Sequence, residues 1–387
     1  MEHSTRAQLP MILEDLGTAR GSEATAIAEF ARFETADFDF RQLHDWYRGQ
    51  VSPVVWGAGV TMTDIDERRN RIVIGVAESE RIPEVRARLL AAGVPEGVWE
   101  VVVSPPIRAV PPIVQATSGE CDPEIAIEEC DDEPTPPGWW SLREKVRGAR
   151  GGLQITNISS TALCSIGFNL VLDPPGAGSD PARYFVTASH CTNISGVLSG
   201  VGMGQAGQAD FLGTEILDPP YTSVAPLCPS GFLCRYSDAA LFEYGTPSEA
   251  SGASIAWPTS LGGLIFSSSH QVTQLEAFPL LGMELQKVGR TTGRSAGQVT
   301  QTCVDVAPSG PTYPSGAMLL CQGLAAASAA SGDSGGPVVR VLPSGALSAV
   351  GVLWGETEQG TVFAFSHIGD VLLDLTEAGG ATPTPVF

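Results

Sequence analysis

The residues best suited to chemistry lie near the C-terminal end, in Gly332-Asp333-Ser334-Gly335-Gly336-Pro337. A serine between small residues fits a tight turn, and the glycines after it let a second backbone approach closely. The amides of Gly332 and Ser334 can then point at one spot beside the hydroxyl, where an oxyanion would be stabilised. A serine hydroxyl is a weak nucleophile at neutral pH, so this interpretation requires a base and an orienting acid elsewhere. The alternative is a glycine-rich turn whose serine has no chemical role.

Two further residues are placed as that base and acid would be. His190, one of five histidines, follows the apolar stretch 184–188, which predicts a strand whose end would hold the imidazole rigidly. Asp238 is followed at once by Ala239-Ala240-Leu241-Phe242, so it begins a buried strand. A buried carboxylate needs a partner, and an imidazole N–H would supply one. Each signal alone is weak, because histidines at strand ends are often structural and many aspartates before strands form turns.

His190, Asp238 and Ser334 follow one another in the order of one class of triad enzymes. Residues from about 150 to 376 resemble the chymotrypsin-like (trypsin-fold) serine peptidases, and the matching stretches are 187–191, 238–241 and 332–337. The resemblance implies a mainly β fold of two barrels with the active site between them. It also implies a serine endopeptidase that cuts proteins or peptides through an acyl-enzyme and needs no cofactor.

The stretch Lys287-Val288-Gly289-Arg290-Thr291-Thr292-Gly293 is similar to one in bacterial members such as streptogrisins and α-lytic protease. In those proteins the arginine is buried against the aspartate before the catalytic serine, which implies an ion pair between Arg290 and Asp333. A buried carboxylate beside the expected oxyanion hole must be compensated. An internal arginine would make the site independent of a newly cut N-terminal amine. The alternative is a solvated arginine in a turn.

The resemblance also assigns the primary specificity pocket. It places Ser328 at the base of the pocket, and Trp354 and Gly355 on the strand whose backbone pairs with the substrate. A neutral, open pocket is expected to prefer an apolar or aromatic residue before the cut. Leu353 departs from the family, because a serine that bonds the triad aspartate is common there. His367 does not lie where glutamate-selective members place their histidine.

The eight cysteines predict disulfides rather than a metal site. Their even number and loop-closing spacing are typical of an oxidising compartment, and no Cys-x-x-Cys or Cys/His cluster is present. The resemblance implies that Cys164 pairs with Cys191 and that Cys303 pairs with Cys321. Two remaining pairs, Cys121 with Cys130 and Cys228 with Cys234, are inferred from proximity in the sequence only.

Composition limits the class of protein. The chain has 387 residues, of which 43% are hydrophobic and 17% are charged, as in a globular protein of two or three domains. The net charge of −21 and the lack of a basic stripe argue against nucleic-acid binding. No segment is expected to span a membrane, and the N-terminus has no signal-peptide pattern. Either a signal has been removed or the chain is cytosolic; the cysteines favour removal, hence a secreted or periplasmic protein.

Four regions are expected along the chain. Residues 1–107 predict a helix followed by a small α/β domain of ββαβ order, and 108–147 a proline-rich acidic linker. The peptidase domain is expected over 148–376 and a flexible tail over 377–387. Bacterial members of the family often carry an N-terminal pro-region of this size. The N-terminal domain is therefore a candidate intramolecular inhibitor or chaperone.

A second class of function remains open at this point. The chain could be a binding protein on a peptidase fold, either catalytically dead or locked by its own N-terminal domain. The intact triad argues against the dead version and says nothing about the locked one. A lipase or esterase would instead show Gly-x-Ser-x-Gly between a strand and a helix, with the histidine last.

Overall fold

The computed structural model describes residues 36–57, 59–109, 113–114, 135–173, 183–224, 228–357, 359–380 and 382–385. By packing, the chain divides into two units, Met1–Gln42 and Leu43–Phe387, and every strand given below lies in the second. None of the helices in these ranges is long and apolar enough to cross a membrane.

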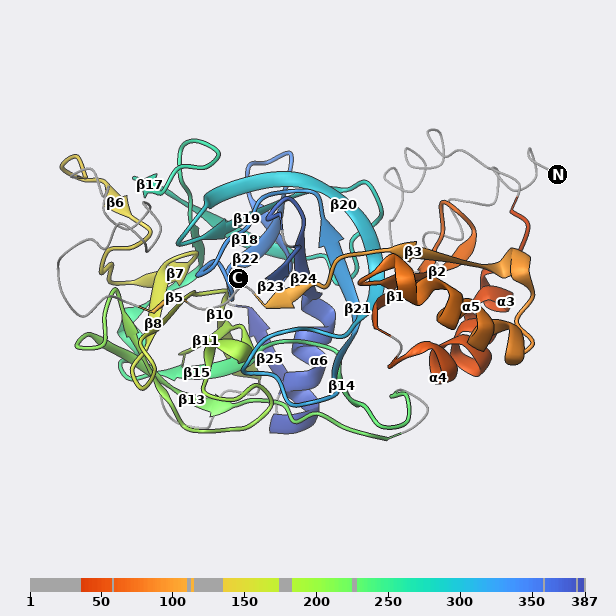
Figure 1. The fold of residues 1–387 in the computed structure, drawn as a ribbon. Helices are drawn as coiled ribbons and strands as arrows, with labels where there is room; N and C mark the ends of the chain where they lie inside the picture. The colour runs from red at the N-terminus through yellow and green to blue at the C-terminus, as the bar shows by residue number, and fades with distance from the viewer. Residues whose placement is uncertain are drawn as a thin grey trace. The chain divides into compact units, whose positions relative to one another are not determined.

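The first barrel is a nine-stranded antiparallel sheet (Figure 1). Its strands, in their order across the sheet, are β25 (Thr382–Pro385), β10 (Asn169–Asp173), β11 (Arg183–Thr187), β15 (Ala240–Tyr244), β13 (Phe211–Leu217), β12 (Gly202–Gln205), β8 (Gln154–Asn157), β9 (Ala162–Ser165) and β5 (Ile113–Val114). His190 follows β11 and Asp238 precedes β15, and these two strands are paired. Strand pairing thus brings together two residues that are distant in sequence.

The second barrel lies in a fourteen-stranded sheet, and Ser334 stands just before one of its strands. Its main strands are β19 (Glu284–Gly289), β20 (Gly293–Val306), β21 (Ala317–Ala325), β22 (Pro337–Val341), β23 (Leu347–Glu356) and β24 (Phe363–His367). Shorter strands complete it: β4 (Arg108–Ala109), β7 (Ala149–Gly151), β14 (Leu233–Arg235), β16 (Ala250–Ala256) and β18 (Ser269–Leu275). A separate pair joins β6 (Trp140–Ser141) to β17 (Ile265–Phe266). Helix α6 (Ile368–Gly379) follows β24 and buries Ile368, Val371 and Leu375.

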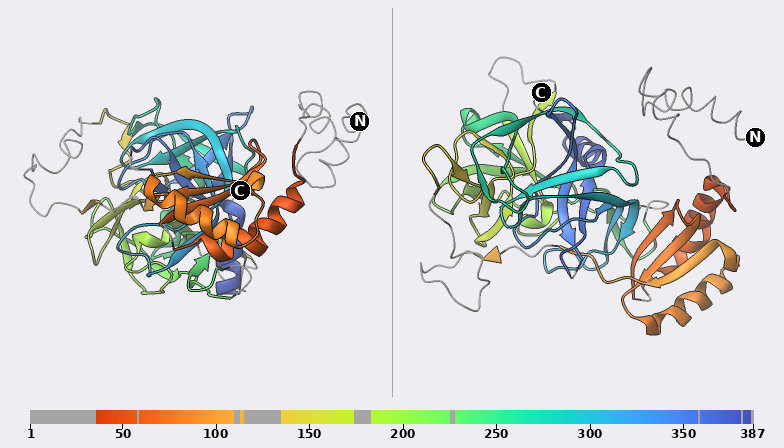
Figure 2. Two further views of the ribbon diagram at one scale, coloured as in Figure 1. Left: turned by 45° about the vertical axis from the view of Figure 1, so that its right-hand side comes forward. Right: turned by 90° about the horizontal axis from the view of Figure 1, so that it is seen from above.

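A small α/β unit precedes the barrels. Its elements are α3 (Phe40–Trp46), α4 (Ser52–Val55), β1 (Val60–Asp66), β2 (Arg71–Val76), α5 (Ile82–Ala91) and β3 (Trp99–Val103). β1 and β2 are antiparallel, whereas β2 and β3 are parallel and need the crossover that α5 supplies (Figure 2). This is the expected ββαβ order. β1 also pairs with β20, Met62 opposite Val306, so this sheet continues into the second barrel.

Two regions predicted to be irregular contain paired strands. The predicted linker, 108–147, includes β4, which pairs with β23, and β5, which pairs with β9. The predicted tail, 377–387, holds the end of α6 and β25, which pairs with β10. In both places the backbone groups of the segment form hydrogen bonds with the edge strand of a sheet. The composition of the segment does not reveal this tertiary pairing. The acidic run of the linker lies outside the described residues.

The mainly β, two-barrel prediction is confirmed. One large hydrophobic core contains residues from both barrels, including Leu153, Phe185, Phe242, Val352 and Trp354. The strands next to His190, Asp238 and Ser334 therefore share a common core.

Candidate active site

The structure brings His190, Asp238 and Ser334 into one hydrogen-bonded chain. His190 Nε2 lies 2.8 Å from Ser334 Oγ, and His190 Nδ1 is hydrogen-bonded to Asp238 Oδ2. The backbone N–H of His190 also donates to Asp238 Oδ1, at 3.1 Å. His190 sits on a 3-10 turn, Ser189–Cys191, directly after β11. The imidazole is therefore held on both sides, with one ring nitrogen on the carboxylate and the other on the hydroxyl.

The turn that carries Ser334 depends on glycine. Gly332 has a φ of +94° and Gly335 a φ of +85°, where L side chains are strained. A Cβ on Gly335 would lie 2.0 Å from Thr187 Oγ1, so no other residue fits there. The turn is fastened to the first barrel, because the Ser165 N–H donates to Ser334 O at 2.8 Å. It is also fastened to β23, because the Gly335 N–H donates to Leu353 O at 2.7 Å.

The cation against Asp333 is Lys287, which corrects the expected pair of Asp333 with Arg290. Lys287 Nζ lies 2.8 Å from Asp333 Oδ2, and both side chains are fully buried. The Arg290 guanidinium instead donates to Gln154 Oε1, at 2.9 Å, and to Thr291 Oγ1. Lys287 lies on β19 two positions before Gly289, where a Cβ would also meet Asp333, so both residues are on the face of the strand that is turned to the carboxylate. The sequence motif located the right segment. The choice between its two cations depends on which side chain faces Asp333, and Lys287 lies on β19 whereas Arg290 follows the end of that strand.

Both carboxylate oxygens of Asp333 accept hydrogen bonds. Its Oδ1 accepts from the Thr291 and Thr292 N–H groups, and its Oδ2 accepts from Thr292 Oγ1 and the Ala330 N–H. Burial alone would raise the pKa of Asp333, but Lys287 and these donors hold that pKa below its ordinary value. The carboxylate thus stays charged and fixes the turn before Ser334.

Tyr313 supplies a contact to the triad that sequence reasoning missed. Its hydroxyl donates to Asp238 Oδ2 at 3.0 Å. Burial, and then the charge of Asp238, raise the pKa of Tyr313 well above its ordinary value, so the hydroxyl keeps its proton. Ser366 Oγ accepts from the Asp238 N–H at 2.9 Å. Tyr313 lies in a loop of glycines and prolines, where no pattern marks a functional tyrosine.

The charge of Asp238 follows from these contacts. Burial alone would raise its pKa, but His190, and then Arg235 and Tyr313, hold the pKa below its ordinary value. Asp238 therefore stays ionised, as the partner of an imidazolium must.

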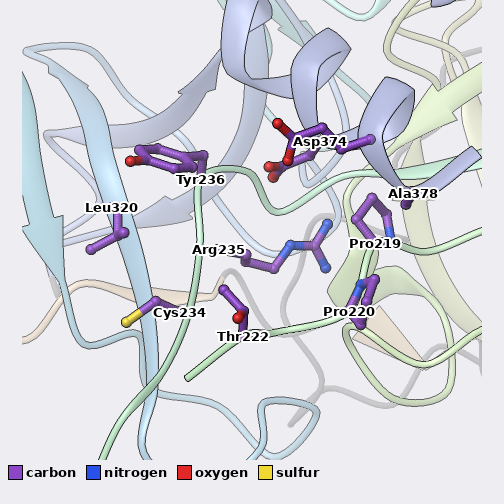
Figure 3. A pocket seen from close by; sticks show the side chains of 10 residues that line it. Pro219, Pro220, Thr222, Cys234, Arg235, Tyr236, Leu320, Asp374 and Ala378 are labelled. Carbon is purple, nitrogen blue, oxygen red and sulfur yellow. The ribbon is translucent and has the colours of Figure 1, made fainter. Parts of the chain in front are cut away.

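A buried ion pair supports the turn on which His190 sits. Arg235 and Asp218 are 3.0 Å apart, and Ser189 Oγ donates to Asp218 Oδ1 at 2.7 Å. Figure 3 shows the Arg235 side chain with Asp374 among the residues that line a cavity of about 290 Å³. Asp374 accepts from the N–H and the hydroxyl of Ser237, the residue before Asp238. This network fixes the segments on either side of the histidine–aspartate contact.

The three residues predicted to determine specificity, Ser328, Trp354 and Gly355, have different surroundings. Ser328 is exposed, and its carbonyl accepts from Ser295 Oγ at 2.7 Å. The Trp354 side chain is 0% exposed and donates to Gln322 Oε1, so it belongs to the core and does not line a cleft. The backbone at Gly355 faces β4. Alternation along β23 turns Trp354 inward, which its aromatic type does not indicate.

Three disulfides join described cysteines, and all three are predicted pairs: Cys164–Cys191, Cys228–Cys234 and Cys303–Cys321. The first bridge ties β9 to the turn of His190. Among the described side chains, Cys321, His367 and Asp370 come close enough to hold a metal, but the sulfur of Cys321 is bonded to Cys303.

The fourth predicted pair, Cys121 with Cys130, is not among these three bridges. Cys121 and Cys130 both belong to the acidic run of the linker and lie outside the described residues. Their pairing was inferred only from proximity in the sequence, and no strand or turn of the described fold fixes it. The bond between Cys121 and Cys130 therefore stays a prediction.

No family model matches the chain. Glutamyl endopeptidase 2 of Streptomyces griseus is 30% identical over 174 residues, which cover 45% of this chain and 70% of that protein. A solved glutamic acid-specific serine protease with a histidine triad in substrate binding is 23% identical over 61% of this chain and 100% of that one, with a TM-score of 0.41. Thermobifida fusca protease A is 20% identical over 61% and 98% of the two chains, with a TM-score of 0.40.

The chain is 30% identical to the Streptomyces griseus protein over 70% of that protein's length, and the described two-barrel fold agrees with this relationship. The chain therefore belongs to the bacterial chymotrypsin-like serine endopeptidases.

Proposed function

We propose that Ser334 is the nucleophile of this endopeptidase, His190 its general base and Asp238 the orienting acid. The observation that carries the proposal is the continuous chain of hydrogen bonds from Asp238 through both ring nitrogens of His190 to Ser334 Oγ. Because Nδ1 is held by the carboxylate, Nε2 is free to accept the serine proton. Tyr313 acts through Asp238 as a positioning residue.

In the reaction, Ser334 Oγ bonds to the scissile carbonyl carbon while its proton passes to His190 Nε2. The N–H groups of Gly332 and Ser334 stabilise the resulting oxyanion. His190 then gives the proton to the leaving amine as the C–N bond breaks, which leaves an acyl-enzyme. Water, deprotonated by His190, releases the acid and restores the serine. Asp333, fixed by Lys287, holds the turn that carries both oxyanion donors.

The primary pocket is proposed to favour a neutral apolar or aromatic residue before the cut. Ser328, at the predicted base of the pocket, offers no positive charge. Glu356 lies close to the segment of Ser328, since a Cβ on Gly360 would be 3.1 Å from Ala329 O and 3.4 Å from Glu356 Oε2. Burial raises the pKa of Glu356 to about 7, so above that pH it would repel an acidic side chain. The Streptomyces griseus relative is named a glutamyl endopeptidase, and a peptide library with each residue before the cut would separate these preferences.

Residues 1 to about 147 are proposed to act as a pro-region, and the chain is proposed to be exported. The pairing of β1 with β20 supports an intramolecular role for the α/β unit, and the disulfides support an oxidising compartment. If residues 1–147, supplied separately, neither inhibit residues 148–387 nor raise their folded yield, the pro-region role fails.

Reaction with a fluorophosphonate tests the triad. The reagent should form an adduct on Ser334, and Ser334→Ala should prevent it while leaving the melting temperature nearly unchanged. His190→Ala should reduce adduct formation to a similar extent, because the triad acts as a unit. A chain that never reacts, with or without residues 1–147, would favour a binding protein on this fold.

A further inference from the structure

His367 is a buried histidine whose ring makes no hydrogen bond within the described residues. It is the last residue of β24 and is 1% exposed. Neither Nδ1 nor Nε2 has a hydrogen-bond partner there, and the ring stands edge-on to that of Phe278, with 5.6 Å between the ring centroids. An unpaired polar group costs free energy in a protein interior, so buried polar atoms are nearly always bonded. Both nitrogens of His367 are therefore available to a ligand.

Asp370 presents a carboxylate to the same place. It follows His367 by three residues in the first turn of α6, a spacing that puts two side chains on one side of a helix. Its Oδ2 lies 3.7 Å from His367 Nδ1. Among the described residues this oxygen has no hydrogen-bond partner either. The start of α6 thus holds an imidazole and a carboxylate side by side, both buried and both unpaired.

The protonation states of these two groups suit a metal. Burial lowers the pKa of His367 to about 4, so its imidazole is neutral at pH 7 and can give a lone pair to a metal. Burial, and then the charge of Asp374, raise the pKa of Asp370 to about 7. A divalent cation beside Asp370 would favour its charged form. A bound cation would therefore stabilise two groups that the fold leaves without partners.

Two sulfur atoms lie beside these groups. Ligand atoms of Cys321, His367 and Asp370 are all within 4.8 Å of one another. Cys321 is bonded to Cys303 across the paired strands β21 and β20. β21 pairs in turn with β24, which ends at His367 (Figure 1). Three strands and the start of α6 thus bring two cysteines, a histidine and an aspartate to one point.

The cluster can be reached from solvent. A cavity of about 480 Å³ is lined by His367, Cys303 and Cys321, together with the side chains of Phe278 and Leu280 at its outer part. Phe278 is 56% exposed and Leu280 is 53% exposed. Cys303 is exposed and Cys321 is half-buried. Small ions and reagents therefore have a path to both sulfur atoms and to the imidazole.

The ligand types and their spacing fit zinc. Zinc in proteins binds thiolate sulfur at about 2.3 Å and imidazole nitrogen or carboxylate oxygen at about 2.0–2.2 Å, arranged as a tetrahedron. Such bonds place two ligand atoms roughly 3.3–3.8 Å apart. The 3.7 Å between His367 Nδ1 and Asp370 Oδ2 lies in that range. Mg²⁺ and Ca²⁺ instead prefer sites made of oxygen ligands.

We propose that Cys303, Cys321, His367 and Asp370 form a zinc site when the disulfide between the two cysteines is open. The disulfide and the zinc ion are then alternative links between β20 and β21, and the zinc ion also ties both strands to α6. The site shares no residue with the triad, so the proposal does not depend on the assignment of the nucleophile.

Opening the disulfide requires a reductant, which we take to be a dithiol. The dithiol gives two electrons and two protons to the S–S bond and becomes a disulfide itself, which leaves two thiols on the chain. Zn²⁺ then replaces the two thiol protons, which pass to water, and binds both thiolates. Cys303→Ser reaches nearly the same site without a reductant, because it frees the thiol of Cys321.

The first test uses the full chain with Cys303→Ser, in which Cys321, His367 and Asp370 remain and no other described disulfide is opened. Co²⁺ is the probe, because a thiolate bound to Co²⁺ absorbs strongly in the near ultraviolet. The variant should bind one Co²⁺ per chain with this absorption, and Zn²⁺ should displace it. The oxidised parent should show neither the absorption nor comparable zinc binding.

Substitution of the other ligands tests the composition of the site. Asp370→Asn and His367→Gln, each added to Cys303→Ser, should weaken zinc binding at least about tenfold. His44→Ala in the same background is the control, since the side chain of His44 is 51% exposed and lies outside the cluster. The control should bind zinc as Cys303→Ser does.

Three results would overturn the proposal. The first is a Cys303→Ser chain that binds Co²⁺ without the thiolate absorption, or does not bind it. The second is a zinc affinity that neither Asp370→Asn nor His367→Gln changes. The third is an oxidised parent that binds zinc as tightly as Cys303→Ser.

Alkylation of the unaltered chain tests the site even if Cys303→Ser does not fold. The chain is reduced with dithiothreitol, freed of it under argon, and treated with iodoacetamide with and without Zn²⁺. Zinc should slow the alkylation of Cys303 and Cys321 at least about tenfold and leave that of Cys228 and Cys234 nearly unchanged. Equal effects of zinc on the two pairs would contradict the proposal.

Discussion

Lys287 and Asp333 form a fully buried ion pair, 2.8 Å apart, directly behind the turn that presents Ser334. Burial lowers the pKa of Lys287, and Asp333 partly offsets that effect. The pair joins β19 to the turn and gives the site an internal cation.

Lys287→Met should destabilise the protein strongly, because it leaves the Asp333 carboxylate buried without its cation. Breaking such a pair typically costs about 3–5 kcal/mol. Urea unfolding would measure the loss, with Lys145→Met as a control at a side chain that is 47% exposed. The control should change stability by less than about 1 kcal/mol. Equal effects of the two substitutions would show that the buried pair has no special role.

Tyr313→Phe should slow the reaction of Ser334 without unfolding the protein. It removes a hydrogen bond to the charged Asp238, and such bonds contribute about 1.5–3 kcal/mol, or roughly a tenfold loss or more. The rate of fluorophosphonate inactivation should fall, and its acid limb should move to higher pH because Asp238 loses a donor that lowers its pKa. Tyr236→Phe is the control, since Tyr236 is half-buried on another segment. An unchanged pH profile would mean that Tyr313 is merely structural.

Asp64→Asn should make stability less dependent on pH. Burial raises the pKa of Asp64 to about 7, although the Gln301 amide donates to it at 2.8 Å. Since an unfolded aspartate has a pKa of about 3.9, the folded chain binds more protons between these values. This contribution to stability is complete below about pH 4 and is lost as the pH rises through 7.

Melting temperatures at pH 5 and pH 8 would measure that effect. The drop between the two should be smaller for Asp64→Asn than for the parent, and Asp45→Asn, at a side chain that is 75% exposed, should match the parent. A drop as large in Asp64→Asn as in the parent would argue against the raised pKa.

The sequence picked out the three residues that the structure joins, His190, Asp238 and Ser334, because each lies at a strand boundary with a recognisable flank. The sequence could not distinguish Lys287 from Arg290 as the partner of Asp333, since both belong to one motif. The end of β19 at Gly289 decides which of the two side chains faces Asp333. The sequence placed Trp354 on the strand expected to pair with the substrate backbone, but it did not indicate that the Trp354 side chain lies in the core. It also read 108–147 as a linker. The short strands β4 and β5 are stable only through the edges they pair with, and those edges are formed by residues far away in the sequence.

The most direct test of the central claim is the mass and position of the adduct formed with a fluorophosphonate. The full chain and the Ser334→Ala chain, each with and without residues 1–147, are treated alike and analysed by peptide mass spectrometry. The account predicts one adduct, on Ser334, that forms in the parent and not at all in Ser334→Ala. An adduct on another residue, or one that persists in Ser334→Ala, would contradict the assignment of Ser334 as the nucleophile.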